Sequence, residues 1–152
     1  MGSELRFVHA VDDSRSERML RMRTALAQAR LLSLAERVAT EGAARPAVSV
    51  KVGSTIHAIA AAADEWQPHL IVMGRPRRQR FELLIGTTAE RIIRATHCPL
   101  LIVNGSGRTP YRKVVLATDL SPTSVHVART AVKMGWLDAA YTWIVHAFNP
   151  PP

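Results

Sequence analysis

With 152 residues, the chain is long enough for one domain with a sizeable core. Its 47% hydrophobic residues exclude an intrinsically disordered chain, and no apolar run reaches the roughly 20 residues of a membrane span. The formal net charge of +8 makes polyanions a class of partner to consider, although scattered arginines on solvated helices account for most of it.

Short apolar runs alternate with helical segments along the first 104 residues. Strands are predicted at residues 5–11, 47–52, 70–73 and 100–103. Helices are predicted from Ser14, as a cap, to about residue 40, over residues 54–66, and from Gly86-Thr87 onward. Along the first helix one apolar stripe is expected, formed by Met19, Met22, Leu26, Leu34 and Val38. Strands that are apolar on both faces and joined through helices indicate an α/β fold with a Rossmann-like open parallel sheet and helices on both faces.

A second group of elements follows a linker. Residues 105–112 are rich in glycine, serine and proline, which is typical of a linker. A strand is predicted at residues 113–118, and Ser121-Pro122 begins a helix that runs to about residue 134. The last strand is predicted at residues 142–148. We therefore divide the chain into residues 1–104, the linker, and residues 113–152.

A short repeat relates the two parts of the chain. Residues 7–11, FVHAV, recur as residues 144–148, IVHAF, and the offset of 145 − 8 = 137 residues is about one domain. Three identical residues are a weak signal of a repeat by themselves. Each copy is nevertheless an apolar run that ends in a polar turn, so the two segments are interpreted as equivalent strands.

The segment around Gly86 carries a family resemblance. The run LLIGTTAERIIR at residues 83–94, followed by CPLLIV at residues 98–103, resembles the C-terminal half of the universal stress protein family. The resemblance implies a nucleotide-binding α/β fold with strand order 3-2-1-4-5. It also makes residues 7–11 and 144–148 the second strands of two tandem repeats. Residues 1–104 would then lack their first strand and helix, and residues 113–152 would be the first strand, helix and strand of the next repeat.

A sheet that lacks its central strand exposes two unpaired edges, which is costly. Residues 113–118 are the expected central strand, supplied in cis or by exchange with a second chain. The linker residues 104–112 reach about 30 Å when extended, and the return path takes roughly 22 Å, so closure in cis is feasible. Residues 142–148 would then be a surplus strand, which favours a homodimer.

The resemblance also implies an ATP site. Many members of the family bind ATP through a loop of Gly, two residues, Gly, nine residues, and Gly followed by Ser or Thr. Here Arg77 stands in place of the second glycine, and eight residues separate it from Gly86. The cofactor-binding residues that we predict are Val11, Gly74, Arg75, Arg77, Gly86, Thr87, Thr88, Asp119 and Ser121. Because of Arg77 and the shortened loop, we expect adenine nucleotide to bind weakly or not at all.

Several of these residues also have a purely structural interpretation. Thr87 and Glu90 fit a helix capping box, Gly74 fits a turn after a strand, and Asp119 with Ser121 fits a turn followed by a helix cap. A competent ATP-binding switch that uses Asp119, Gly74, Gly86 and Thr87 remains an alternative to the weakened site.

The basic loop after Gly74 supports a further alternative. It holds four guanidinium groups, which would attract phosphate strongly: Arg75, Arg77, Arg78 and Arg80. A polyanion or nucleic-acid binder is therefore the third hypothesis. The loop has one aromatic neighbour, Phe81, and no nucleic-acid motif accompanies it, so specific nucleic-acid binding is not expected.

The sequence gives no sign of catalysis. The six histidines lack metal-ligand spacing, and His9 and His146 are predicted to be packed and hydrogen-bonded within strands. His97 and Cys98 are not expected to pair, because adjacent strand residues point to opposite faces; Cys98 is predicted as a small core residue. We therefore expect neither an enzyme nor a metal site. A single cysteine fits a reducing compartment, so a cytoplasmic location is expected.

Overall fold

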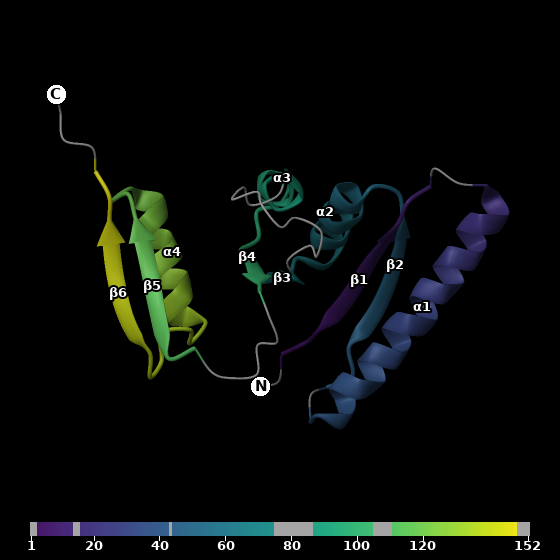
Figure 1. Cartoon of the computed structure of the whole chain (residues 1–152), viewed down its shortest axis with the longest axis horizontal. Helices are drawn as coiled ribbons and strands as arrows, with labels where there is room; N and C mark the ends of the chain where they lie inside the picture. The colour runs from purple at the N-terminus through teal and green to yellow at the C-terminus, as the bar shows by residue number, and fades with distance from the viewer. Residues whose placement is uncertain (1–2, 14–15, 43, 75–86, 105–110, 149–152) are drawn as a thin grey trace. The chain divides into compact units, whose positions relative to one another are not determined.

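A computed structural model describes residues 3–13, 16–42, 44–74, 87–104 and 111–148. The chain divides into two compact units, Met1–Asn104 and Gly105–Pro152. Helices and strands alternate along both (Figure 1). Within the described ranges, no helix combines the length and the apolar character that crossing a membrane requires.

The first unit begins with a parallel strand pair. Strand β1 (Arg6–Val11) pairs with β2 (Ala47–Val52), and helix α1 (Glu17–Thr40) connects them. Helix α2 (Thr55–Trp66) packs on β1, and Figure 1 shows α1 and α2 on opposite sides of the pair. The pair is therefore covered on both faces, as a parallel sheet requires.

A second parallel pair completes this unit. Strand β3 (Ile71–Gly74) pairs with β4 (Leu100–Val103), and helix α3 (Thr87–Ala95) packs against α2. The buried apolar side chains of the unit are mostly alanines, which lets helices approach closely. Among the described residues they are Val11, Ala27, Ala35, Ala58, Ala62, Ala63, Ala89 and Ile92.

The second unit is one strand–helix–strand element. Strand β5 (Lys113–Thr118) pairs in parallel with β6 (Tyr141–His146), and helix α4 (Pro122–Lys133) connects them and packs on β5. The predicted start of this helix is confirmed: the Ser121 hydroxyl accepts the Ser124 amide at 3.2 Å, and Pro122 occupies the first turn. This serine cap satisfies an amide that has no partner within the helix.

The α/β fold class is confirmed, with strands and helices alternating in parallel units. The described strands form three two-stranded sheets, with orders β1-β2, β3-β4 and β5-β6. The five-stranded order 3-2-1-4-5, with residues 113–118 as its central strand in cis or by exchange, stays a prediction. The tandem-repeat arrangement also stays a prediction.

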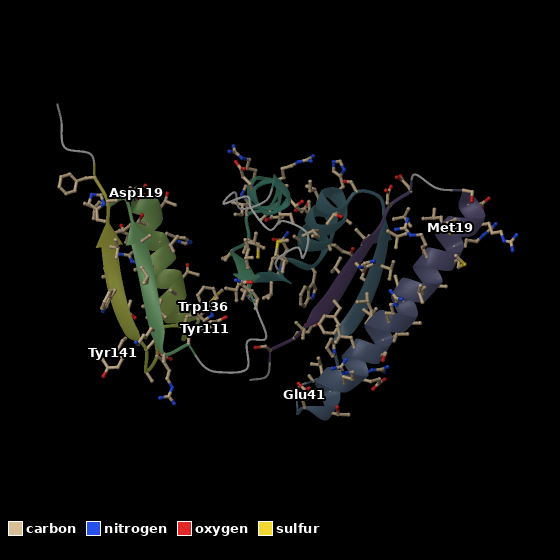
Figure 2. The ribbon with its side chains drawn as sticks, viewed as in Figure 1. Met19, Glu41, Tyr111, Asp119, Trp136 and Tyr141 are labelled. Atoms are coloured by element: carbon tan, nitrogen blue, oxygen red, sulfur yellow. The ribbon has the colours of Figure 1, made fainter. Side chains whose placement is uncertain are left out.

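Helix α1 departs from its expected apolar stripe. Met19 (Figure 2), Met22 and Leu26 are 42%, 59% and 50% exposed, whereas Ala27 and Ala35 are buried. The prediction was wrong because it followed the largest apolar residues. Helix α1 instead turns its alanine-containing side to the strands, where small side chains permit close packing. The helix also begins at Glu17, with Ser16 in the N-cap position, rather than directly after Ser14.

Two glycines that follow or end strands differ in backbone conformation. Gly53 has a φ angle of +124°, which residues with an L side chain rarely adopt, whereas the φ angle of Gly74 is not positive. An added Cβ would meet nothing within 4 Å at either position. The predicted turn at Gly74 therefore does not depend on glycine for its φ angle.

We expect Gly53→Ala to lower the free energy of unfolding by about 1–3 kcal/mol, because the residue would be held in a strained conformation. The matched variant Gly74→Ala should change it by less than about 0.5 kcal/mol. Urea denaturation followed by circular dichroism measures both. Equal losses for the two variants would contradict the assignment of strain to Gly53.

Candidate functional site

In the first unit, the predicted site residues lie at the carboxyl ends of strands. Val11 ends β1 and is 2% exposed, so its side chain belongs to the core. Its carbonyl accepts the Gly53 amide at 2.8 Å. Gly74 ends β3, opposite Val103 of β4. The carboxyl ends of strands in a parallel sheet are where ligands bind in this class of fold, so both positions are compatible with the predicted roles.

The start of helix α3 holds two further predicted residues. The helix begins at Thr87, and Thr88 is half-buried. The Glu90 carboxylate forms an ion pair with Arg94 at 2.9 Å, one turn further along the helix. Glu90 is the acidic residue of the predicted capping box, and its carboxylate is therefore paired with Arg94. The neighbouring loop, with Arg75, Arg77 and Gly86, lies outside the described residues.

In the second unit, Asp119 is the centre of a hydrogen-bonded turn directly after β5 (Figure 2). Its Oδ1 accepts the Ser121 amide at 2.9 Å and also the Ser124 hydroxyl. The Ser124 Oγ in turn accepts the Asp119 amide at 3.2 Å. These bonds fix the carboxylate at the start of helix α4. The hydrogen bonds from Ser121, and then from Ser124, hold the pKa of Asp119 well below its usual range, so the group is an anion at neutral pH.

An imidazole lies at the same edge of the second unit. His146 Nδ1 is 2.8 Å from the Thr118 carbonyl oxygen, across the β5-β6 pair. Its ring stacks on Phe148, with centroids 6.1 Å apart and planes 14° apart. The expectation that His146 is hydrogen-bonded is confirmed, but both His146 and His9 are exposed rather than packed in a core.

The two units therefore hold different parts of the predicted set. Asp119 and Ser121 come together in the second unit, while Val11, Gly74 and Thr88 belong to the first. Sequence reasoning did not include Ser124 or Phe148 in the site. The spacing Asp119-x-Ser121-x-x-Ser124 could have indicated the first, since Asp and Ser at a helix start bond to nearby amides. The repeat offset of 137 residues, which matches Phe148 with Val11, could have indicated the second.

The surroundings of Cys98 favour a neutral thiol. Its thiol is partly buried and donates to the Pro68 carbonyl oxygen at 3.1 Å. Burial raises the pKa of the Cys98 thiol, which disfavours the reactive thiolate. The adjacent His97 side chain is exposed. In the part of the chain that the structure describes, no group of three His, Cys, Asp or Glu side chains could hold a metal ion.

Parallel strand–helix–strand units with polar residues at the carboxyl ends of their strands define a Rossmann-like α/β protein. A model of the universal stress protein family matches residues 1–104 of the 152-residue chain. The chain therefore belongs to the universal stress protein family, and the family resemblance of residues 83–103 is confirmed. A search of curated proteins found no match.

Proposed function

We propose that this stress-response module of the universal stress protein family acts by binding and dimerisation, with weak affinity for adenine nucleotide. Membership of the family supports the stress-response role. The observation that carries the nucleotide part is the Asp119 carboxylate, which the Ser121 amide and the Ser124 hydroxyl hold in one orientation. A fixed anion at a strand end is suited to accept hydrogen bonds from ribose hydroxyl groups.

The sequence of the predicted phosphate-binding loop is the reason why we propose a weak affinity. Glycines let a loop backbone approach phosphate closely, and Arg77 replaces one of the loop glycines that ATP-binding members of the family use. The spacing from Arg77 to Gly86 is also one residue shorter than in that loop pattern. Arginine side chains supply charge there, but a flexible side chain loses conformational entropy when it binds.

A second candidate function is polyanion binding. The net charge of +8 and the four arginines between residues 75 and 80 favour it. Binding of this kind depends on release of counterions, so its affinity falls steeply as salt is added. It would also not require the adenine base or the carboxylate of Asp119.

Calorimetric titration of the full chain with ATP, at low and at moderate salt, tests the proposal. We expect saturable binding with a dissociation constant of about 0.1–1 mM that changes little with salt. Inorganic tripolyphosphate is the control, because it carries the charge without adenosine. Equal binding of tripolyphosphate with steep salt dependence would replace the proposal by polyanion binding. The absence of heat at both salts would remove the nucleotide part.

A further inference from the structure

The hydrogen bond of His146 determines which of its ring nitrogens carries a proton. His146 Nδ1 lies 2.8 Å from the carbonyl oxygen of Thr118, its register partner in β5. A carbonyl oxygen only accepts hydrogen bonds, so Nδ1 is the donor. In the neutral form of the ring, Nε2 then carries a lone pair and accepts hydrogen bonds. His146 therefore presents an acceptor on the side of its ring that points away from Thr118.

A second acceptor lies at the same end of the strand pair. Asp119 directly follows Thr118, to which His146 is bonded. The Ser121 amide and the Ser124 hydroxyl donate to its Oδ1. A carboxylate has roughly four lone-pair sites, so Asp119 can accept further hydrogen bonds from a ligand. The carboxyl end of β5 and β6 thus offers an imidazole nitrogen and a carboxylate as neighbouring acceptors.

Among the described residues, few backbone donors remain at this end of the unit. Four amides around the start of α4 already donate to nearby side-chain oxygens, and they are those of Asp119, Leu120, Ser121 and Ser124. Pro122, in the first turn, has no amide hydrogen. Free amides are what make a helix N-terminus an anion site, so the start of α4 is poorly suited to phosphate. The anionic carboxylate of Asp119 would also repel a phosphate group.

An aromatic surface accompanies the two acceptors. The rings of His146 and Phe148 stack with their centroids 6.1 Å apart and their planes 14° apart. The two residues are two positions apart, and such residues point to the same side of an extended chain. Nucleobases stack readily on aromatic side chains because every base has a flat π-face. The ring pair is therefore suited to hold the base of a ligand whose donor groups reach the acceptors.

We propose that this end of the second unit recognises the nucleoside part of its ligand rather than the phosphates, with His146 as a specificity-determining residue. The acceptors select the ribose hydroxyl groups, which can donate, whereas the oxygens of an ionised phosphate only accept. Adenosine should therefore bind about as tightly as ATP. This inference rests on the proposed binding of adenine nucleotide and identifies the part of the nucleotide that the protein recognises.

All contacts of this candidate site lie within the β5-β6 pair and the residues that follow each strand. Ligands bind at the carboxyl ends of strands in this class of fold, and that end stays the same whichever elements cover the two faces of the pair. In the predicted order 3-2-1-4-5, the second strand lies beside the first, as β6 lies beside β5 (Figure 1). The site is therefore compatible with residues 113–118 as a central strand.

Calorimetric titration of the full chain with three ligands tests the inference. Adenosine and ATP should bind with dissociation constants within about threefold of each other. The third ligand, 2′,3′-dideoxyadenosine, lacks the two ribose hydroxyl groups and should bind at least about tenfold more weakly than adenosine, because the acceptors would lose their partners. Equal binding of dideoxyadenosine, or adenosine at least about tenfold weaker than ATP, would overturn the inference and leave the proposed function standing. The absence of binding by both adenosine and ATP would remove the nucleotide part of the proposed function as well.

Two substitutions of His146 separate ligand binding from a structural role. In His146→Gln, a carbonyl oxygen takes the position of Nε2, so the adenosine affinity should stay within about threefold of the wild type. In His146→Asn, the amide nitrogen can still donate to Thr118 but the outward acceptor is lost, so the affinity should fall at least about fivefold. His126→Asn, at an exposed position of α4, is the matched control and should leave the affinity unchanged.

The reverse order of the two His146 variants, with glutamine harmful and asparagine harmless, would show that His146 acts only through its bond to Thr118. That result would overturn its role in specificity. Circular dichroism confirms that each variant is folded. The comparison of the three ligands uses the wild type, so it stays decisive if a variant fails to fold.

Discussion

Replacing Ile92 by alanine is expected to lower the free energy of unfolding by about 2–5 kcal/mol, because the change leaves a cavity in a closely packed core. Ile92 lies on α3 and is 0% exposed, which makes it the largest fully buried side chain of the described residues. Its neighbour Ile93 is 53% exposed, so Ile93→Ala is a matched control that should cost less than about 1 kcal/mol.

Urea denaturation followed by far-ultraviolet circular dichroism measures both isoleucine variants. The difference between them isolates burial, since the two changes remove the same atoms from adjacent positions of one helix. Similar losses for both would show that α3 does not pack as described.

Replacing Asp119 by alanine is expected to weaken ATP binding at least about tenfold, since hydrogen bonds to charged groups contribute about 1.5–3 kcal/mol. The variant removes the carboxylate and frees the Ser121 amide and the Ser124 hydroxyl that it now orients. Because those bonds keep the pKa of Asp119 low, the carboxylate stays ionised at mildly acidic pH. ATP binding by the wild type should therefore not weaken there through protonation of Asp119.

Asp138→Ala is the control for this second prediction. It removes one negative charge from the same unit, in the turn after α4 rather than beside Ser121. Calorimetry should therefore show unchanged ATP affinity for Asp138→Ala. If both variants bind ATP like the wild type, the carboxylate has no part in the site and the arginine-rich loop becomes the better candidate.

The elements that were easiest to predict are those with clear boundaries in the sequence. Strands β4 and β5 occur at the predicted residues, 100–103 and 113–118, because each is an apolar run next to proline, glycine or charged residues. The start of α4 was predictable because a serine cap and a proline are adjacent in sequence. By contrast, apolar residues lie on more than one side of α1, so the sequence alone does not indicate which side packs against the strands.

The candidate site was predictable in part for a similar reason. Asp119 and Ser121 are near neighbours, so the sequence indicates their turn directly. The contact between His146 and the Thr118 carbonyl joins residues 28 positions apart, and it depends on the register of β5 and β6. Parallel register is set by tertiary packing rather than by a local turn, so this neighbour of Asp119 could not be predicted from the local sequence.

The alanine content of the first unit restricts how its sequence can change. Six of the eight buried apolar residues in its described part are alanines, at positions 27, 35, 58, 62, 63 and 89. The side chain of alanine is a single methyl group, so replacing it by glycine or serine leaves almost no cavity in the core. Larger residues would force the helices away from the strands, at a cost of about 1–3 kcal/mol each. Over evolutionary time, these positions are therefore expected to vary among small residues, whereas Ile92 tolerates only other large apolar side chains.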